Sequence, residues 1–433
     1  MNYIKLLIFL YSLLPLSYSM LYFLKGRTNT AVIFYPVFFL FYPLHLLFDV
    51  VFGVPYYPKK FSQLEIAVGN HEVISVYLIY IFFLITLIWC LQLKVKVRVS
   101  DILPNSKGEL KLNISRALML LLTISSFYFI SSPNPEDYLI YGKVREVVRG
   151  MLFLDPIAMH YGQVAFFSMI SAFFILVVRV MLGKECNNKV RKWLIFLLLV
   201  NIYVNNKRLV MAFLPLFYLV EIFIFDGKKG SIRNFILSLV IFAACYYLYA
   251  VYLKIDSSKL DEDLIYFYLR HELGRDDIMM YVIQKKIFLN GYIMEYPGQS
   301  FIASLLNYFP RGLYADKPYP YSQYLTNVMI SGNVGAALMG WTVTTSVFDE
   351  FISNFGSIGL LLGPIFLISY CRFTDNISTP TFKLLFVFVL MLLIIVHTSP
   401  YATLLYACIG YFIMNYSQRF LISAGFSKGK YRI

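Results

Sequence analysis

One stretch of the chain between its long apolar runs, residues 254–346, collects cations of the kind that hold an anion. Two further cations, Lys207 and Arg208, lie in the short polar hairpin NNKRL at 205–209. Guanidinium groups offer a fork of donors that matches phosphate oxygens, and they keep their charge at any working pH. The residue types therefore predict a phosphate or pyrophosphate site. Its candidate ligands are Arg208, Arg270, Arg275, Arg311 and Lys317.

A hydroxyl nucleophile that attacks such a substrate would gain from a general base. Glu350, placed at the outer start of a predicted span, is the first candidate, His271 the second, and Asp276 the third. Glu350 has a structural alternative, because a carboxylate also stabilises the N-terminal end of a helix.

Residues 261–288 give a helical pattern in which His271 and Arg275 fall on the apolar stripe, one turn apart. This placement requires the helix to continue through Gly274. Two interpretations stay open. The arginine could extend to the membrane surface beside its histidine, or the pair could face a buried cavity and bind an anion.

Several other chemistries lack their residues. The segments HEVIS and HELGR have no second histidine for a zinc site, and no phosphate-binding loop or GxGxxG sequence occurs. The acidic triplet at 261–263 resembles the metal-binding Asp-x-Asp motif of transferases that use nucleotide sugars. Such triplets are, however, common on solvent-exposed faces. We therefore expect no metal and no cofactor. We also expect no nucleic-acid partner, since no nucleic-acid signature accompanies the positive charge.

The composition predicts the elements that position these side chains. The chain has 433 residues, of which 59% are hydrophobic and 14% charged. Several apolar runs reach about 18 residues or more, the length that crosses a bilayer as a helix. A β-barrel would show shorter alternating segments instead. The fold class is therefore all-α, a polytopic integral membrane protein.

We predict about 11 transmembrane helices, with ten or twelve as the alternatives. Their approximate ranges are 4–24, 30–53, 72–93, 115–133, 159–182, 192–206, 208–225, 234–253, 347–371, 383–397 and 401–418.

The formal charge of +14 fits this membrane interpretation, because cytoplasmic loops of membrane proteins collect Lys and Arg. Loops such as KVKVR at 94–98 and KECNNKVRK at 184–192 fall on one side and are predicted to be cytoplasmic. The N-terminus then lies outside and the C-terminus inside. On this count residues 254–346 form one long extracytoplasmic loop, which we expect to cap the single membrane domain.

Three segments resemble one family. FPRGLYADKPYP at 309–320 is followed by SVFDEFISNFGSIGLLLGP at 346–364, and NNKRLVMAFLPLF lies at 205–217. Together they are similar to the O-antigen polymerases, which carry Pro-Arg and Lys-Pro in the outer loop and a Glu ahead of Asn-Phe-Gly. Asp349 departs from this pattern, because a small residue is expected beside the Glu.

The resemblance implies an enzyme of the outer face of the bacterial inner membrane. Such a glycosyltransferase moves a growing glycan from undecaprenyl pyrophosphate onto the next lipid-linked repeat unit, in O-antigen or capsular polysaccharide synthesis. It implies no nucleotide sugar and no metal. Expected partners are undecaprenyl-pyrophosphate-linked oligosaccharides, membrane lipid, a co-polymerase that regulates chain length, and a flippase.

Other classes remain open. An O-antigen ligase carries a comparable outer loop and differs in its acceptor. A flippase for lipid-linked oligosaccharides would bind the same carrier but line the interiors of its spans with charge. A multi-span acyltransferase would need an inward His or Arg site. A purely structural membrane protein would leave the outer arginines without a role.

Overall fold

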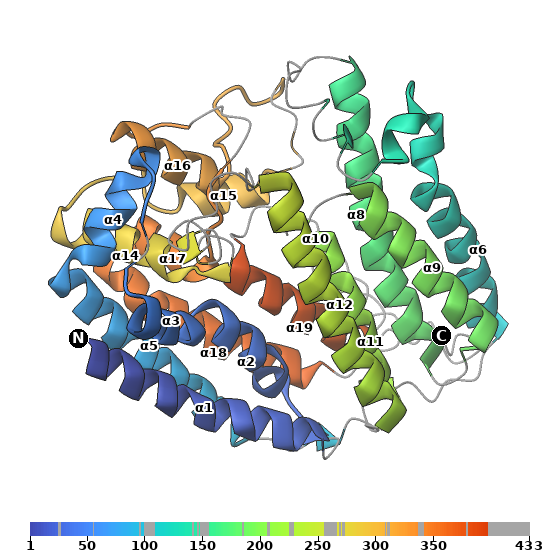
Figure 1. The fold of residues 1–433 in the computed structure, drawn as a ribbon, viewed down its shortest axis with the longest axis horizontal. Coiled ribbons are helices and arrows are strands. Elements are labelled where there is room, and N and C mark those ends of the chain that lie inside the picture. The colour runs from blue at the N-terminus through green and yellow to red at the C-terminus, as the bar shows by residue number, and fades with distance from the viewer. Residues whose placement is uncertain are drawn as a thin grey trace, which may run out of the picture.

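The computed structural model is built almost entirely of helices (Figure 1). It describes residues 1–24, 27–54, 56–94, 97–98, 109–140, 143–144, 147, 156–183, 186–205, 208–224, 229–254, 266–267, 270, 273–307, 309, 312–336, 342–377 and 380–396. In this part of the chain the strands are two antiparallel two-residue segments, β1 (Arg27–Thr28) and β2 (Val97–Arg98).

The helices form two groups (Figure 1). The first group contains α1 (Asn2–Leu24), α2 (Thr30–Phe41), α3 (Pro43–Phe52), α4 (Ser62–Gly69), α5 (His71–Gln92), α14 (Asp276–Ile283), α15 (Gln299–Leu305), α16 (Tyr321–Ser331), α17 (Val347–Phe355) and α18 (Gly359–Asn376). The second contains α6 (Glu109–Ser126), α8 (Pro156–Leu182), α9 (Asn188–Asn205), α10 (Arg208–Met211), α11 (Phe213–Ile224) and α12 (Lys229–Lys254).

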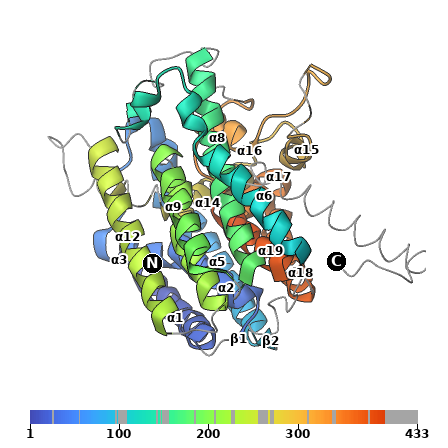
Figure 2. The same cartoon turned by 90° about the vertical axis from the view of Figure 1, so that its right-hand side faces the viewer.

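One helix joins the two groups. α19 (Pro380–Ile395) contacts α2, α17 and α18 on one side and α8 on the other. In the second group, α8 packs on α6 and α9, which lie beside it in Figure 2, and α12 packs on α11. Short helical turns complete the described chain: η1 (Lys59–Phe61), η3 (Tyr128–Ser131), η4 (Pro135–Tyr138), η7 (Gln284–Phe288) and η8 (Gly356–Ile358).

Among the described residues, five helical stretches are long and apolar enough to cross a membrane, so the chain is a helical membrane protein by length and composition. They are Asn2–Tyr22, Thr30–Phe52, His71–Gln92, Pro156–Val180 and Val347–Asn376. All five overlap predicted spans, and shorter apolar helices cover 213–222, 230–244 and 385–395. The count of eleven stays a prediction, and span 401–418 lies outside the described residues.

The predicted span 347–371 differs from the structure in one respect. The chain turns at Gly356, which has φ 59°, and α17 folds back along the start of α18. A Cβ added to Gly359 would lie 2.4 Å from the Phe351 carbonyl oxygen. One added to Gly363 would lie 3.3 Å from the Phe348 ring. Residues 347–371 are therefore two packed helices rather than one straight span.

The first long stretch after α1 is also interrupted. Pro43 has no backbone N–H, so the helical ladder of residues 30–52 breaks at Tyr42 and restarts as α3. At the other end, the Asn29 side chain caps α2 by accepting from Val32 N at 2.9 Å. The break leaves carbonyl groups at the end of α2 that need partners from elsewhere.

The described helices of residues 254–346, which are predicted to form the outer loop and are called the outer segment below, pack on the first group. Its helices α14, α15 and α16 gather beside α4 and α17 (Figure 1). All eight residues of α14 are buried. This helix is therefore an interior element of the bundle, while its predicted function as part of a cap stays a prediction.

Candidate functional site

Arg270 is the centre of a buried ion-pair network. Its side chain is 0% exposed, and its two terminal nitrogens donate to Asp49 of α3 and Asp276 of α14. Asp49 also accepts from Lys5 Nζ of α1 at 2.6 Å and from the Tyr266 hydroxyl at 2.9 Å. A substrate phosphate would therefore compete with Asp49 and Asp276 for the terminal nitrogens of Arg270.

Arg275 joins the ends of three helices. Its backbone N–H donates to Phe41 O, the last residue of α2, at 3.2 Å. Its Nε donates to Ile395 O, the last residue of α19, at 2.8 Å. The guanidinium also lies 5.1 Å from the Phe41 ring centroid. A cation at the C-terminal ends of helices is favoured by their dipoles, and Arg275 is itself the N-cap position of α14.

The helix predicted to continue through Gly274 is interrupted at that residue. The prediction that His271 and Arg275 share one face of a continuous helix is therefore wrong. A Cβ on Gly274 would lie 2.6 Å from Arg270 O, because the chain makes a tight turn at this point. The turn allows Arg270 and Asp276 to pair, and α14 begins only at Asp276. His271 lies outside the described residues.

Two adjacent carboxyls open α14. Asp276 is paired with Arg270, whereas Asp277 accepts from Ile278 N through Oδ1 at 2.7 Å. Among the residues that the structure describes, the buried Oδ2 of Asp277 has no hydrogen-bond partner. Burial, and then the negative charge of Asp276, raise the pKa of Asp277 to about 7. The charge of this cluster therefore changes near neutral pH.

Glu350 lies in the first turn of α17 and is 0% exposed. The neighbouring Asp349 closes a capping box with Ser346: Ser346 N donates to Asp349 Oδ1 at 2.6 Å. Asp349 therefore caps the helix. Because Asp349 has this structural role, Glu350 stays the candidate base on α17. The helix that carries Glu350, α17, packs on α14.

The Asn-Phe-Gly segment attaches the outer segment to α17. Asn354 accepts from Gly298 N at 2.9 Å and donates to Ser300 Oγ at 2.8 Å. The Phe355 ring stacks on Phe301 with centroids 6.1 Å apart, and Gly356 supplies the left-handed turn into α18. The three residues therefore have local structural roles at the contact between α15 and α17.

Lys317 closes the loop that carries Arg311. Its Nζ donates to Asn307 O at 2.7 Å and to Phe309 O at 3.0 Å. Arg311 itself and the side chain of Arg208 lie outside the described residues, although Arg208 begins α10. The structure thus brings Arg270, Arg275 and the helix of Glu350 together, and it gives Lys317 contacts within its own loop.

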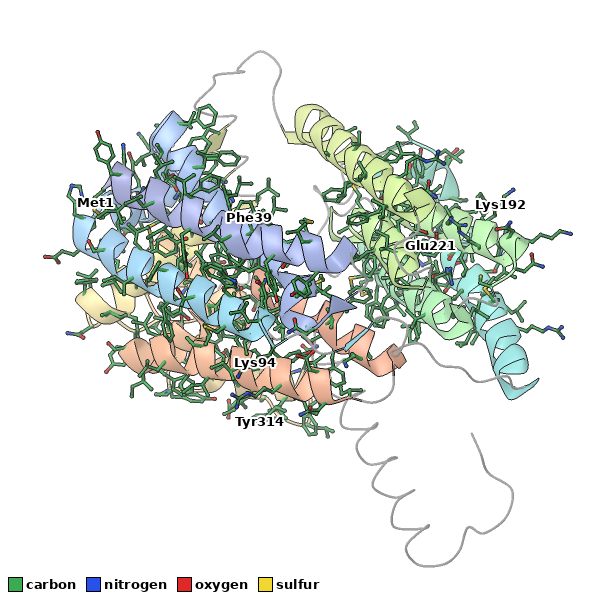
Figure 3. All side chains as sticks on the ribbon, turned by 90° about the horizontal axis from the view of Figure 1, so that it is seen from below. Met1, Phe39, Lys94, Lys192, Glu221 and Tyr314 are labelled. Atoms are coloured by element: carbon green, nitrogen blue, oxygen red, sulfur yellow. The ribbon has the colours of Figure 1, made fainter. Side chains whose placement is uncertain are left out.

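Sequence reasoning missed five charged residues that the structure pairs in buried clusters. Lys5 and Asp49 belong to the network above. In the second group lies the buried Glu221 of α11 (Figure 3). It binds Arg179 of α8 at 3.1 Å and Arg191 of α9 at 2.6 Å. The available signal was a charged residue inside an apolar run, because such a residue must find a partner.

No described group of three His, Cys, Asp or Glu side chains is arranged to hold a metal ion. Comparison of the chain with family models, with curated proteins and with solved structures gave no match.

Proposed function

We propose that the chain is a membrane glycosyltransferase that polymerises undecaprenyl-pyrophosphate-linked oligosaccharide repeat units. It would act at the outer face of the bacterial inner membrane. The observation that carries the proposal is the buried charged cluster where the outer segment meets the first group of helices. Its described members are Lys5, Asp49, Arg270, Arg275, Asp276 and Asp277. Ionisable groups at such depth are a functional signal in a membrane protein.

Two of the three family-like segments fall on the same region, while the third, 205–217, lies in the second group. The segment 346–364 forms α17 and the start of α18, and α17 packs on α14. The segment 309–320 leads into α16, whose Tyr321 hydroxyl lies 2.6 Å from Ser353 Oγ of α17. Family-like sequence and buried charge therefore share one set of contacting helices, which supports a single site in this region.

The proposed reaction forms one bond and breaks another. The acceptor hydroxyl oxygen bonds to the anomeric carbon of the donor glycan while the bond from that carbon to pyrophosphate breaks. The hydroxyl proton passes to Glu350, the proposed base, with His271 as the alternative. Undecaprenyl pyrophosphate leaves as an anion, which fixed cations stabilise in a water-poor site.

The proposed ligands of the pyrophosphate differ in how freely they could reach it. Arg270 and Arg275 already donate to protein oxygens, so they would act first by fixing the site. Lys317 likewise donates to two backbone oxygens of its own loop, so Arg208 and Arg311 would supply the direct contacts. Loss of one donor to a developing charge typically costs about 3 kcal/mol of transition-state stabilisation.

An O-antigen ligase is the second candidate, since its outer loop and carrier are comparable. Deletion of the gene separates the classes by surface lipid. Loss of a polymerase leaves lipid that bears a single repeat unit, whereas loss of a ligase or flippase removes even that unit. We expect single-unit lipid in the deletion strain, and its absence would contradict the proposal.

The Arg311→Ala variant tests the direct contact. We expect single-unit lipid at a normal protein level, because the pyrophosphate would lose a donor. Arg116→Ala, at an exposed position of α6, is the matched control and should give wild-type chains. Long chains in the Arg311→Ala strain would remove Arg311 from the site.

A further inference from the structure

Asp49 occupies a position where an apolar residue is expected. It lies in the apolar stretch Thr30–Phe52 and is 4% exposed. Three side chains from two other segments converge on its carboxylate: Lys5 of α1, and Tyr266 and Arg270 of the outer segment. A carboxylate buried this deeply is stable only when it is paired. Asp49 therefore connects the first two long helical stretches to the outer segment.

The connection extends to Arg275. Arg270 binds Asp49 with one terminal nitrogen and Asp276 with the other, so it spans the turn at 270–276. The turn is tight, because Gly274 has no space for a Cβ against Arg270 O. Arg275 follows immediately and donates to the last carbonyls of α2 and α19. A shift of the turn would therefore move Arg275 and the first turn of α14.

We infer that Asp49 is a positioning residue that holds the start of the outer segment on the N-terminal helices and so aligns Arg275 and α14 with α17. α14 packs directly on α17, which carries Glu350. The effect of Asp49 on product formation rests on the proposed function. Its effect on the position of α14 does not.

The first test measures hydrogen exchange of residues 276–283 in the full-length protein in detergent. In Asp49→Asn, the buried cations Lys5 and Arg270 lose their shared counter-charge. The turn should open more often, and exchange in α14 should rise on the order of tenfold or more. Asp49→Glu keeps the charge and should restore most of the protection.

A matched control removes a comparable carboxylate elsewhere. Asp137 is 6% exposed and accepts from Lys143 Nζ at 2.8 Å and from the Tyr161 hydroxyl at 2.6 Å. Asp137→Asn should leave exchange in α14 unchanged. Wild-type exchange in Asp49→Asn, or an equal rise in Asp137→Asn, would overturn the inference.

A second variant covers the case in which Asp49→Asn fails to fold. Lys5→Met combined with Asp49→Asn removes both members of the ion pair and should recover folded protein. Exchange in α14 should stay fast, because Arg270 still lacks the negative charge of Asp49. Wild-type protection of α14 in this double variant would also overturn the inference.

The activity arm separates this inference from the proposed function. Asp49→Asn should shorten the polymer ladder, Asp49→Glu should restore it, and Asp137→Asn should leave it unchanged. A wild-type protein that makes no polymer would contradict the proposed function. The hydrogen-exchange measurement would still test whether Asp49 positions α14. Asp49→Asn could show fast exchange in α14 and still make polymers of wild-type length. That result would contradict the effect of Asp49 on product formation and leave the proposed function intact.

Discussion

Glu350 has both the burial and the position expected of a base in a water-poor site. It is fully buried in the first turn of α17, and its neighbour Asp349 carries the capping interaction. We predict that Glu350→Gln, which keeps the shape and removes the charge, lowers polymer formation by about 10²–10⁴-fold. Polymerisation by purified protein measures this. The exposed Glu136→Gln should retain full activity, and an active Glu350→Gln would leave His271 as the base.

Asp277 gives the protein a pH dependence of defined sign. Its pKa is raised from 3.8 to about 7, first by burial and then by Asp276. Between these values the folded state holds the proton and the unfolded state does not. The free energy of unfolding therefore falls as pH rises through this window, by up to about 3 kcal/mol between pH 5 and pH 7.

Asp277→Asn should remove this fall in the free energy of unfolding with rising pH, since the asparagine side chain does not ionise. Thermal unfolding in detergent from pH 5 to pH 8 measures it. We expect the variant to gain stability over the wild type as pH rises to 7. The exposed Asp316→Asn should run parallel to the wild type. A constant difference between Asp277→Asn and the wild type across this range would contradict the account.

At the scale of elements, the fold-back of α17 onto α18 depends on Gly359. A Cβ there would lie 2.4 Å from Phe351 O and 2.6 Å from Ile352 Cα, which are backbone atoms that cannot yield cheaply. Gly359→Ala should therefore lower the free energy of unfolding by about 1–3 kcal/mol. Thermal unfolding in detergent measures the loss.

Gly162 in α8 is the matched control for this substitution. It is helical, and a Cβ there would meet nothing within 4 Å. Gly162→Ala should be neutral or stabilising by about 0.5–1 kcal/mol, because alanine favours the helix. Equal stability of the two variants would contradict the packing of α17 against α18.

The sequence predicts the long helices better than their interruptions. Apolar runs at 4–24 and 72–93 become α1 and α5 almost to the residue, since length and hydropathy alone decide them. The reversal at Gly356 also had a local signal, because glycine commonly ends a helix. The apolar residues on both sides nevertheless favoured one span. Gly274 ended the predicted stripe for a similar reason.

The pairing within the candidate site could not be predicted in this way. Asp49 and Arg270 lie 221 positions apart, and Lys5 and Asp49 lie 44 apart. A charged residue in an apolar run shows that a partner is needed, but the partner is set by how the helices pack. The sequence could therefore indicate Arg270 as important without showing that two carboxylates bind it.

At the scale of the whole molecule, two helix groups meet along α19 (Figure 1). The second group holds its own buried cluster, in which Glu221 binds Arg179 and Arg191 (Figure 3). The first group holds the network of Asp49 and Arg270 and receives the described helices of the outer segment. We therefore propose that the reaction takes place at the first group, to which the second would contribute Arg208 of α10.

Reconstitution tests this central claim most directly. Purified protein in liposomes is supplied with undecaprenyl-pyrophosphate-linked repeat units as the only glycan, and the products are separated by length. The account predicts a ladder of lipid-linked polymers from the wild type, which is lost in Arg311→Ala and Glu350→Gln. Unextended single units from well-folded wild-type protein would contradict it.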